Sequence, residues 1–116
     1  MAYTIGHFLS QMNITKSKTK KPFNPMLGET YELVTEDFRF IAEQVSHHPP
    51  VSVYQCEGKD YSFRGSYDTK SQFGIGGGTG LMIVTLFGYQ DYSFEKYNEV
   101  ISINRPRVYV NNLVFG

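Results

Sequence analysis

Two adjacent histidines followed by two prolines are the residues of this 116-residue sequence best suited to chemistry. His47 and His48 lie in the string EQVSHHPP at residues 43–50. An imidazole can act as a general base, ligate a metal ion or donate a hydrogen bond to an anion. The prolines restrain His48 to extended conformations, so its imidazole would be held at a fixed angle without a large ordering cost on binding.

Several interpretations of the histidine pair are open. A metal site is disfavoured, because H-x-x-x-H spacing is missing and neighbouring side chains on an extended chain point to opposite faces. The pair is also compatible with a polar surface turn. Nucleophilic catalysis has little support, since Gly-x-Ser-x-Gly is absent and Cys56 lies on an apolar strand, where a packed, inert thiol is expected. The alternative to binding is a small enzyme with His47 or His48 as general base, which an acid or nucleophile within hydrogen-bond reach would favour.

A second segment, KPFNPMLGETYE at residues 21–32, supplies a cation and an amide. Its prolines predict a shaped, non-helical path. Taken alone, Lys21 and Asn24 are equally compatible with a basic loop and a turn. Together with His47 and His48 they suit a phosphorylated polyol, because lysine provides a point charge and the other groups provide directional donors. We therefore predict that these four side chains gather at one mouth of the fold, for recognition rather than reaction.

A glycine-rich run, GIGGGTG at residues 74–80, does not form a nucleotide site. It satisfies neither G-x-G-x-x-G nor the P-loop pattern. We interpret the run as a flexible link between strands.

Hydrophobic spacing predicts the elements that position these segments. Apolar residues at 5, 8, 9 and 12 have the i, i+3, i+4, i+7 spacing of one helix face, which predicts a helix over 2–12. After Gly28 the period changes to two, which is typical of strands. The predicted strands are 31–34, 38–42, 51–56, 61–67, 81–87, 92–97 and 107–114. The fold class is therefore mainly β, with one N-terminal helix followed by an antiparallel meander.

Composition and charge exclude several classes of protein. Lys plus Arg is 11 and Asp plus Glu is 11, so a general electrostatic attraction to nucleic acid is not expected. One cysteine excludes an internal disulfide and a cysteine zinc cluster. The uncharged stretch 71–90 is interrupted by glycines and does not predict a membrane-spanning helix. A targeting segment is not evident at the N-terminus, which makes a cytosolic protein the default.

The two motifs resemble those of a known family. EQVSHHPP at 43–50 is identified as the signature of the oxysterol-binding protein family, and KPFNPMLGETYE at 21–32 resembles the segment that precedes it there. Residues 1–15 resemble the helix that precedes KPFNP in the family. Residues 108–116 resemble the N-N-L/I-x-x-G strand that follows the middle of the family's lipid-binding domain. The resemblance covers the whole chain and is strongest at 21–58.

The resemblance implies a lipid-transfer domain that is not an enzyme and needs no cofactor or metal. Its fold would be a large, incomplete β-barrel around a hydrophobic lipid tunnel, of which residues 1–116 would be a part without the lid and the C-terminal region. Such proteins exchange a sterol or phosphatidylserine against phosphatidylinositol 4-phosphate between membranes. They would be cytoplasmic and peripheral at membranes and membrane contact sites. Lys21 and Asn24 would contact the headgroup, and His47 and His48 its phosphate.

Apolar residues on the inward side of the strands would line the tunnel. The candidates are Phe63, Leu81, Ile83 and Tyr92. A register slip of one residue would exchange the faces. The second lipid, sterol or phosphatidylserine, is left open by the sequence.

Overall fold

The structure, a computed structural model, describes the backbone of residues 1–11, 23–76 and 79–110, with side chains except those of 69–86 and 107–110. Within these ranges, one helix precedes eight strand segments. The elements are α1 (Ala2–Ser10), β1 (Thr30–Val34), β2 (Phe38–His47), β3 (Pro50–Gly58), β4 (Ser62–Gly76), β5 (Thr79–Phe87), β6 (Tyr89–Phe94), the short 3-10 helix η2 (Glu95–Tyr97), β7 (Glu99–Asn104) and β8 (Arg107–Val110). The mainly β fold with an N-terminal helix is confirmed.

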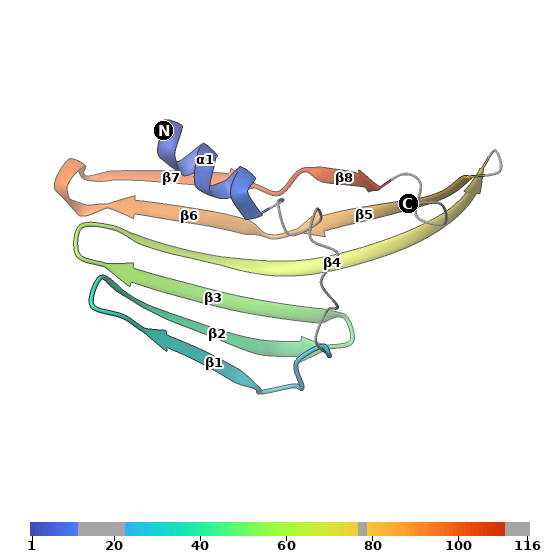
Figure 1. Ribbon diagram of the computed structural model, residues 1–116, viewed down its shortest axis with the longest axis horizontal. Helices are drawn as coiled ribbons and strands as arrows, with labels where there is room; N and C mark the ends of the chain where they lie inside the picture. Colours follow the sequence, from blue (N-terminus) through green and yellow to red (C-terminus); the bar gives the residue numbers. More distant parts are fainter. Residues whose placement is uncertain (12–22, 77–78, 111–116) are drawn as a thin grey trace.

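All described strand pairs are antiparallel, in the order β1-β2-β3-β4-β5-β8, with β6 pairing β4 and β7. β5 and β6 pair with β4 in one continuous register: Phe87 of β5 faces Asp68 of β4, and Gln90 of β6 faces Gly65 of β4. They are therefore two halves of one long strand interrupted at Gly88. β7 pairs with β6, and β8 pairs with β5 with an offset of one residue in register, so the sheet is a six-strand antiparallel meander (Figure 1).

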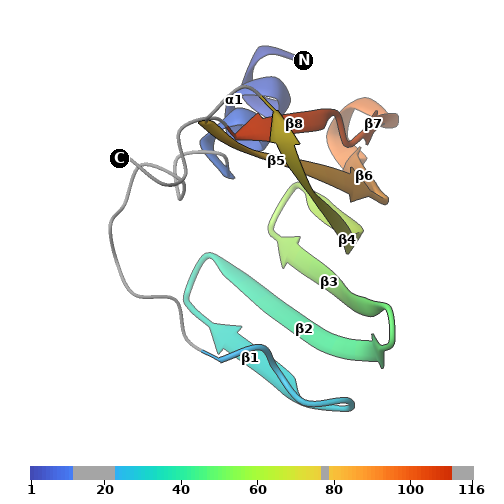
Figure 2. The ribbon, with the colours of Figure 1, turned by 90° about the vertical axis from the view of Figure 1, so that its right-hand side faces the viewer.

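The helix α1 lies close to β6 and β7 and leaves β1 and β2 uncovered (Figure 1 and Figure 2). Phe8 is 5% exposed, and the ring centroid of His7 lies 5.0 Å from that of Phe63 on β4 and 5.8 Å from that of Tyr92 on β6. Of the apolar residues whose spacing predicted the helix, Phe8 is buried but Ile5 and Leu9 are exposed. The face that packs on the sheet is therefore centred on His7 and Phe8 rather than on the predicted apolar stripe.

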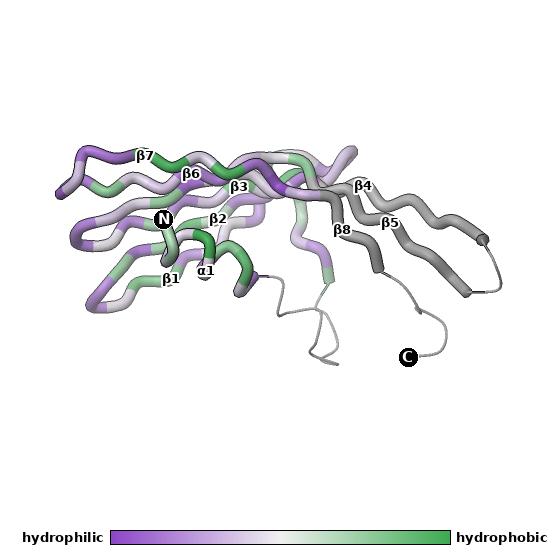
Figure 3. The backbone as a smooth tube through the Cα atoms, turned by 90° about the horizontal axis from the view of Figure 1, so that it is seen from above, coloured by the Kyte–Doolittle hydropathy of each residue, from purple (hydrophilic) through white to green (hydrophobic). Residues whose placement is uncertain are grey.

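The described residues have a small core. Among their apolar side chains, only Phe8, Cys56 and Tyr92 are buried. Along the strand segments coloured in Figure 3, hydrophobic and hydrophilic residues alternate rather than gathering in continuous runs. The radius of gyration is 16.3 Å, whereas a compact domain of this length has about 13 Å. The sheet is open and extended.

Several predicted boundaries differ from the structure. The helix ends at Ser10, and β2 and β4 are longer than predicted. The glycine-rich run is not a free link, since 74–76 belong to β4 and 79–80 to β5, which pair as a hairpin. β7 was missed, and the predicted strand 92–97 ends at Phe94. Asn98, with a left-handed φ of 49°, ends η2 and turns the chain back into β7.

Candidate functional site

The histidine pair lies at the turn between β2 and β3. His47 is the last residue of β2, and His48 and Pro49, joined by a cis peptide bond, form the turn before Pro50. Both imidazoles are exposed, and their ring centroids are 4.5 Å apart. The expectation that they point to opposite faces is therefore wrong, because His48 lies in a turn rather than in an extended strand.

A β-bulge determines the side of the sheet on which His47 lies. Gln44 faces Ser52, but Ser46 faces Val51 and His47 faces Pro50, so β2 contains one extra residue. Facing residues share a side, as do residues two apart along a strand. His47 therefore lies by register on the side of Gln44 and Ser52, which is also the side covered by α1.

The second motif reaches the same end of the sheet. The amide of Gly28 donates to the carbonyl of Gln44 at 2.8 Å, and the amide of Gln44 donates to the carbonyl of Glu29 at 3.0 Å. Figure 1 shows residues 23–28 near the β2–β3 turn, at the opposite end from the β1–β2 turn. Asn24 is exposed there. Lys21 lies outside the described residues, so the gathering of the four side chains stays a prediction.

The described surroundings of the imidazoles contain few groups for catalysis. Apart from their mutual contact, neither imidazole of the pair has a hydrogen bond or ion pair with any residue that the structure describes. In the same part of the chain, no group of three or more His, Cys, Asp and Glu could hold a metal ion. Cys56 is 3% exposed and burial raises the pKa of its thiol, which agrees with the packed, inert thiol that was predicted.

Two adjoining cavities lie between α1 and the sheet, with volumes of about 240 and 280 Å³. Both are lined by His7 and Phe63. The first also contacts Tyr3, Thr4, Tyr61, Tyr92 and Phe94, and the second Gln11, Phe40, Tyr54, Tyr67 and Arg105. The lining is mainly aromatic, as in sites that take apolar ligands.

Arg105 provides the charge in the second cavity and was not predicted. Its Nη2 donates to the Tyr54 hydroxyl at 2.6 Å and its Nη1 to Gln11 Oε1 at 3.4 Å. The guanidinium carbon lies 4.7 Å from the ring centroid of Tyr67. Burial raises the pKa of Tyr54, while the charge of Arg105 opposes that rise. Arg105 could not be predicted from hydrophobic periodicity, because Arg105 lies between β7 and β8, outside the strands in which residues alternate.

The predicted tunnel residues are partly described. Phe63 and Tyr92 face each other across β4 and β6, with ring centroids 5.8 Å apart, and both line the first cavity. Leu81 and Ile83 lie in β5, but their side chains are outside the described part of the chain. The assignment of all four to a tunnel wall remains a prediction.

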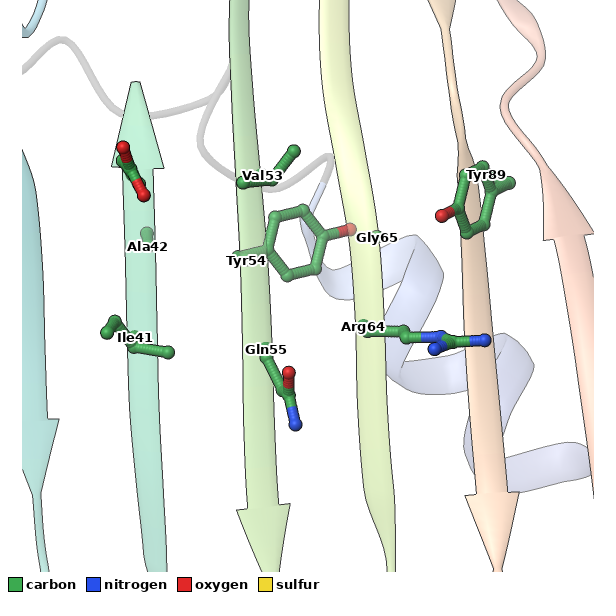
Figure 4. Close-up of a pocket in the computed structure, with 9 residues that line it drawn as sticks. Ile41, Ala42, Val53, Tyr54, Gln55, Arg64, Gly65 and Tyr89 are labelled. Carbon is green, nitrogen blue, oxygen red and sulfur yellow. The ribbon is translucent and has the colours of Figure 1, made fainter. Parts of the chain in front are cut away.

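The other face of the sheet has a shallow groove of about 260 Å³. Its lining includes Ile41, Gln55 and Arg64, and α1 lies behind the strands in this view (Figure 4). Arg64 Nε lies 3.7 Å from Asp91 Oδ2 and so has a carboxylate partner. The groove contains neither histidine of the pair, and Tyr54 is the one lining residue that it shares with the two cavities under α1. Among the described helices, none is long and apolar enough to cross a membrane.

Comparison with known proteins gives consistent matches. The chain is 44% identical over 104 residues to oxysterol-binding protein-related protein 2 of Mus musculus, which covers 85% of this chain and 20% of that protein. It is 58% identical over 60 residues to oxysterol-binding protein-related protein 1 of Homo sapiens, covering 48% of this chain and 6% of that protein. The chain thus spans about a fifth or less of the length of these relatives.

Two crystal structures share the fold. The Osh3 ORD of Saccharomyces cerevisiae, in complex with PI(4)P, is 33% identical with a TM-score of 0.66, over 84% of this chain and 26% of that one. The Osh1 ORD domain, in complex with ergosterol, is 32% identical with a TM-score of 0.62, over 78% of this chain and 22% of that one. The family described as oxysterol-binding protein matches residues 1–116. The chain therefore belongs to the oxysterol-binding protein family.

Proposed function

We propose that this chain forms part of a lipid-binding domain that exchanges a sterol or phosphatidylserine against phosphatidylinositol 4-phosphate between membranes. The observation that carries the proposal is the pair of exposed imidazoles, 4.5 Å apart, at the end of the sheet where the segment with Asn24 also lies. The Osh3 and Osh1 domains, crystallised with PI(4)P and ergosterol, support the two lipid classes.

The headgroup site would combine four donors. His47 and His48 would donate imidazole hydrogen bonds to the lipid phosphate, and Asn24 and Lys21 would bind the rest of the headgroup as an amide donor and a point charge. Both imidazoles are exposed and have no other described polar partner, so they are accessible to such a ligand.

The lipid carbons would lie against the aromatic side of the sheet. Removing apolar surface from water stabilises a complex by about 25 cal/mol per Å². The cavity lined by Phe63 and Tyr92 supplies such a surface under α1. Leu81 and Ile83 would extend it along β5, in a tunnel wall completed by residues that the relatives have beyond the matched segment. This activity would make the protein peripheral at membranes and contact sites, on the cytoplasmic side.

The enzyme hypothesis is less well supported. A general base needs a partner within about 3 Å of the proton that it moves. Neither imidazole has such an acid or nucleophile among the described residues. The family description names binding rather than catalysis.

The proposal is tested with the double variant His47→Ala, His48→Ala of the full-length protein. Loss of charge-assisted hydrogen bonds should cost roughly 1.5 to 3 kcal/mol each, or about tenfold or more per residue. Extraction of phosphatidylinositol 4-phosphate from liposomes should collapse, while uptake of sterol or phosphatidylserine should fall much less.

The matched control is Glu36→Ala, Asp37→Ala, which changes exposed residues in the β1–β2 turn at the other end of the sheet. It should extract both lipids like the wild type. Unchanged phosphoinositide uptake by the histidine variant, at equal folding stability, would refute the assignment. A variant that still binds its ligand but loses turnover would favour the enzyme instead.

A further inference from the structure

We propose that Gln44 is a positioning residue for the headgroup site. Its buried carboxamide holds the bulge that orients His47, and its backbone anchors the segment that carries Asn24. The inference rests on the proposed function, because it concerns the same site.

The carboxamide of Gln44 joins the two strands of the histidine hairpin. Gln44 is only 3% exposed, although glutamine is mostly found at the surface. Its Nε2 donates to the carbonyl of Ser46 at 2.8 Å, and its Oε1 accepts a hydrogen bond from the Ser52 hydroxyl. A buried carboxamide is costly unless its donor and acceptor are both used. Here both are used, and both within the bulged hairpin.

The bulge is what permits the observed turn. Val45 is the extra residue between Gln44 and Ser46. Without the bulge, the pairing of Gln44 with Ser52 would continue until His47 faced Pro49, and His48 alone would be left to form the turn. His47 would then lie on the side of the sheet away from α1. The bond from Gln44 Nε2 to Ser46 spans this extra residue. It therefore stabilises the register that puts His47 on the α1 side.

The backbone of Gln44 fixes the other half of the site. Its amide donates to the Glu29 carbonyl at 3.0 Å, and its carbonyl accepts from the Gly28 amide at 2.8 Å. Glu29 in turn accepts a hydrogen bond from the Met26 amide on its Oε2 at 2.8 Å. These bonds hold the chain just after Asn24 against β2. One residue thus links the two motifs that the headgroup site requires.

The test uses Gln44→Met in the full-length protein, which keeps the side-chain length but removes both hydrogen bonds. We expect phosphatidylinositol 4-phosphate uptake to fall about tenfold, with little change in sterol or phosphatidylserine uptake. The NMR resonances of the His47 and His48 imidazoles should move, because the turn that carries them loses its register. This second readout does not depend on any lipid.

Gln90→Met is the matched control. Gln90 on β6 is 0% exposed, and its Oε1 accepts from Gln11 Nε2 at 3.2 Å, so the same substitution is made at another buried glutamine. It should lower stability without moving the resonances of His47 and His48. Should Gln44→Met fold poorly, Ser52→Ala removes one of the two bonds and should give a smaller shift.

Unmoved imidazole resonances in a folded Gln44→Met protein would overturn the proposal, whatever happens to lipid uptake. The proposal would also fail if Gln90→Met moved the same resonances equally. If the wild type takes up no phosphatidylinositol 4-phosphate but the resonances still move, the lipid function is wrong and the structural role of Gln44 is supported.

Discussion

Tyr92 has a hydroxyl group buried under α1. The residue is 4% exposed, and its hydroxyl lies 2.9 Å from Nδ1 of His7. Burial raises the pKa of Tyr92 to about 12, with a smaller upward contribution from Tyr54 and an opposing one from Arg105. The phenol therefore keeps its proton well above the pH at which an exposed tyrosine ionises.

We expect the stability of the protein to fall in alkaline solution partly through Tyr92. The folded pKa of about 12 is above the unfolded value of about 10. The contribution of the protonated Tyr92 hydroxyl to the free energy of unfolding is therefore fully present below pH 10 and is lost as the pH rises towards 12. Thermal unfolding measures this effect. Between pH 9 and pH 11, the stability of Tyr92→Phe should fall less than the stability of the wild type.

Tyr97→Phe, at an exposed position in η2, is the control for this titration and should follow the wild type. Burial also raises the pKa values of Tyr54 and Tyr61, so part of the alkaline loss should remain in both variants. Equal losses in all three proteins would show that Tyr92 ionises like an exposed tyrosine.

At the scale of elements, the sheet depends on the junction between β5 and β6. Gly88 has a φ of +115°, and a Cβ placed there would lie 2.5 Å from the carbonyl oxygen of Ser66. Only glycine adopts this conformation readily. Its backbone also accepts a hydrogen bond from the amide of Arg105 at 3.4 Å, which holds the matching junction between β7 and β8.

We expect Gly88→Ala to destabilise the protein by about 1–3 kcal/mol, through backbone strain and the clash with Ser66. Thermal unfolding measures the loss. Gly6→Ala is the control, because Gly6 lies in α1 with no atom within 4 Å of the added Cβ. It should be neutral or stabilising by about 0.5–1 kcal/mol. Equal stability of Gly88→Ala and the wild type would contradict the strained junction.

For the whole molecule, the important property is an open sheet with much exposed apolar surface. Exposed large apolar side chains lie on β1, β2 and β7, among other places; examples are Tyr31, Leu33, Val34, Val45 and Val100. β1 is also an edge strand, since it pairs only with β2 in the described sheet. Exposed edges and apolar patches promote association.

We therefore expect the 116-residue chain by itself to bind a hydrophobic dye and to self-associate. Dye fluorescence and light scattering at increasing concentration measure this. The comparison is with the full domain of a relative such as the Osh3 ORD, which should bind less dye per residue. A monomeric chain that melts in one cooperative transition, without dye binding, would show that the open sheet is sufficient for a stable protein.

Much of the fold was predictable because it depends on local patterns. The helix at the N-terminus follows from apolar spacing, and most strands follow from alternation over a few residues. The resemblance of EQVSHHPP and KPFNPMLGETYE to the family motifs pointed to the family, since such strings are specific. Segments 92–97 and 99–104 show where local patterns fail, because the turn at Asn98 depends on a single left-handed residue.

The sequence by itself determined the residue types of the candidate headgroup site and the strand character of its surroundings. Only the tertiary structure decided where His47, His48 and the segment with Asn24 lie. The bulge at Val45 sets the side of His47, and Gln44 brings the Gly28–Glu29 backbone to the same hairpin. Arg105 reaches Tyr54 and Gln11 from positions far away in the chain. Register and long-range pairing depend on contacts between distant segments, and periodicity within one segment contains no information about them.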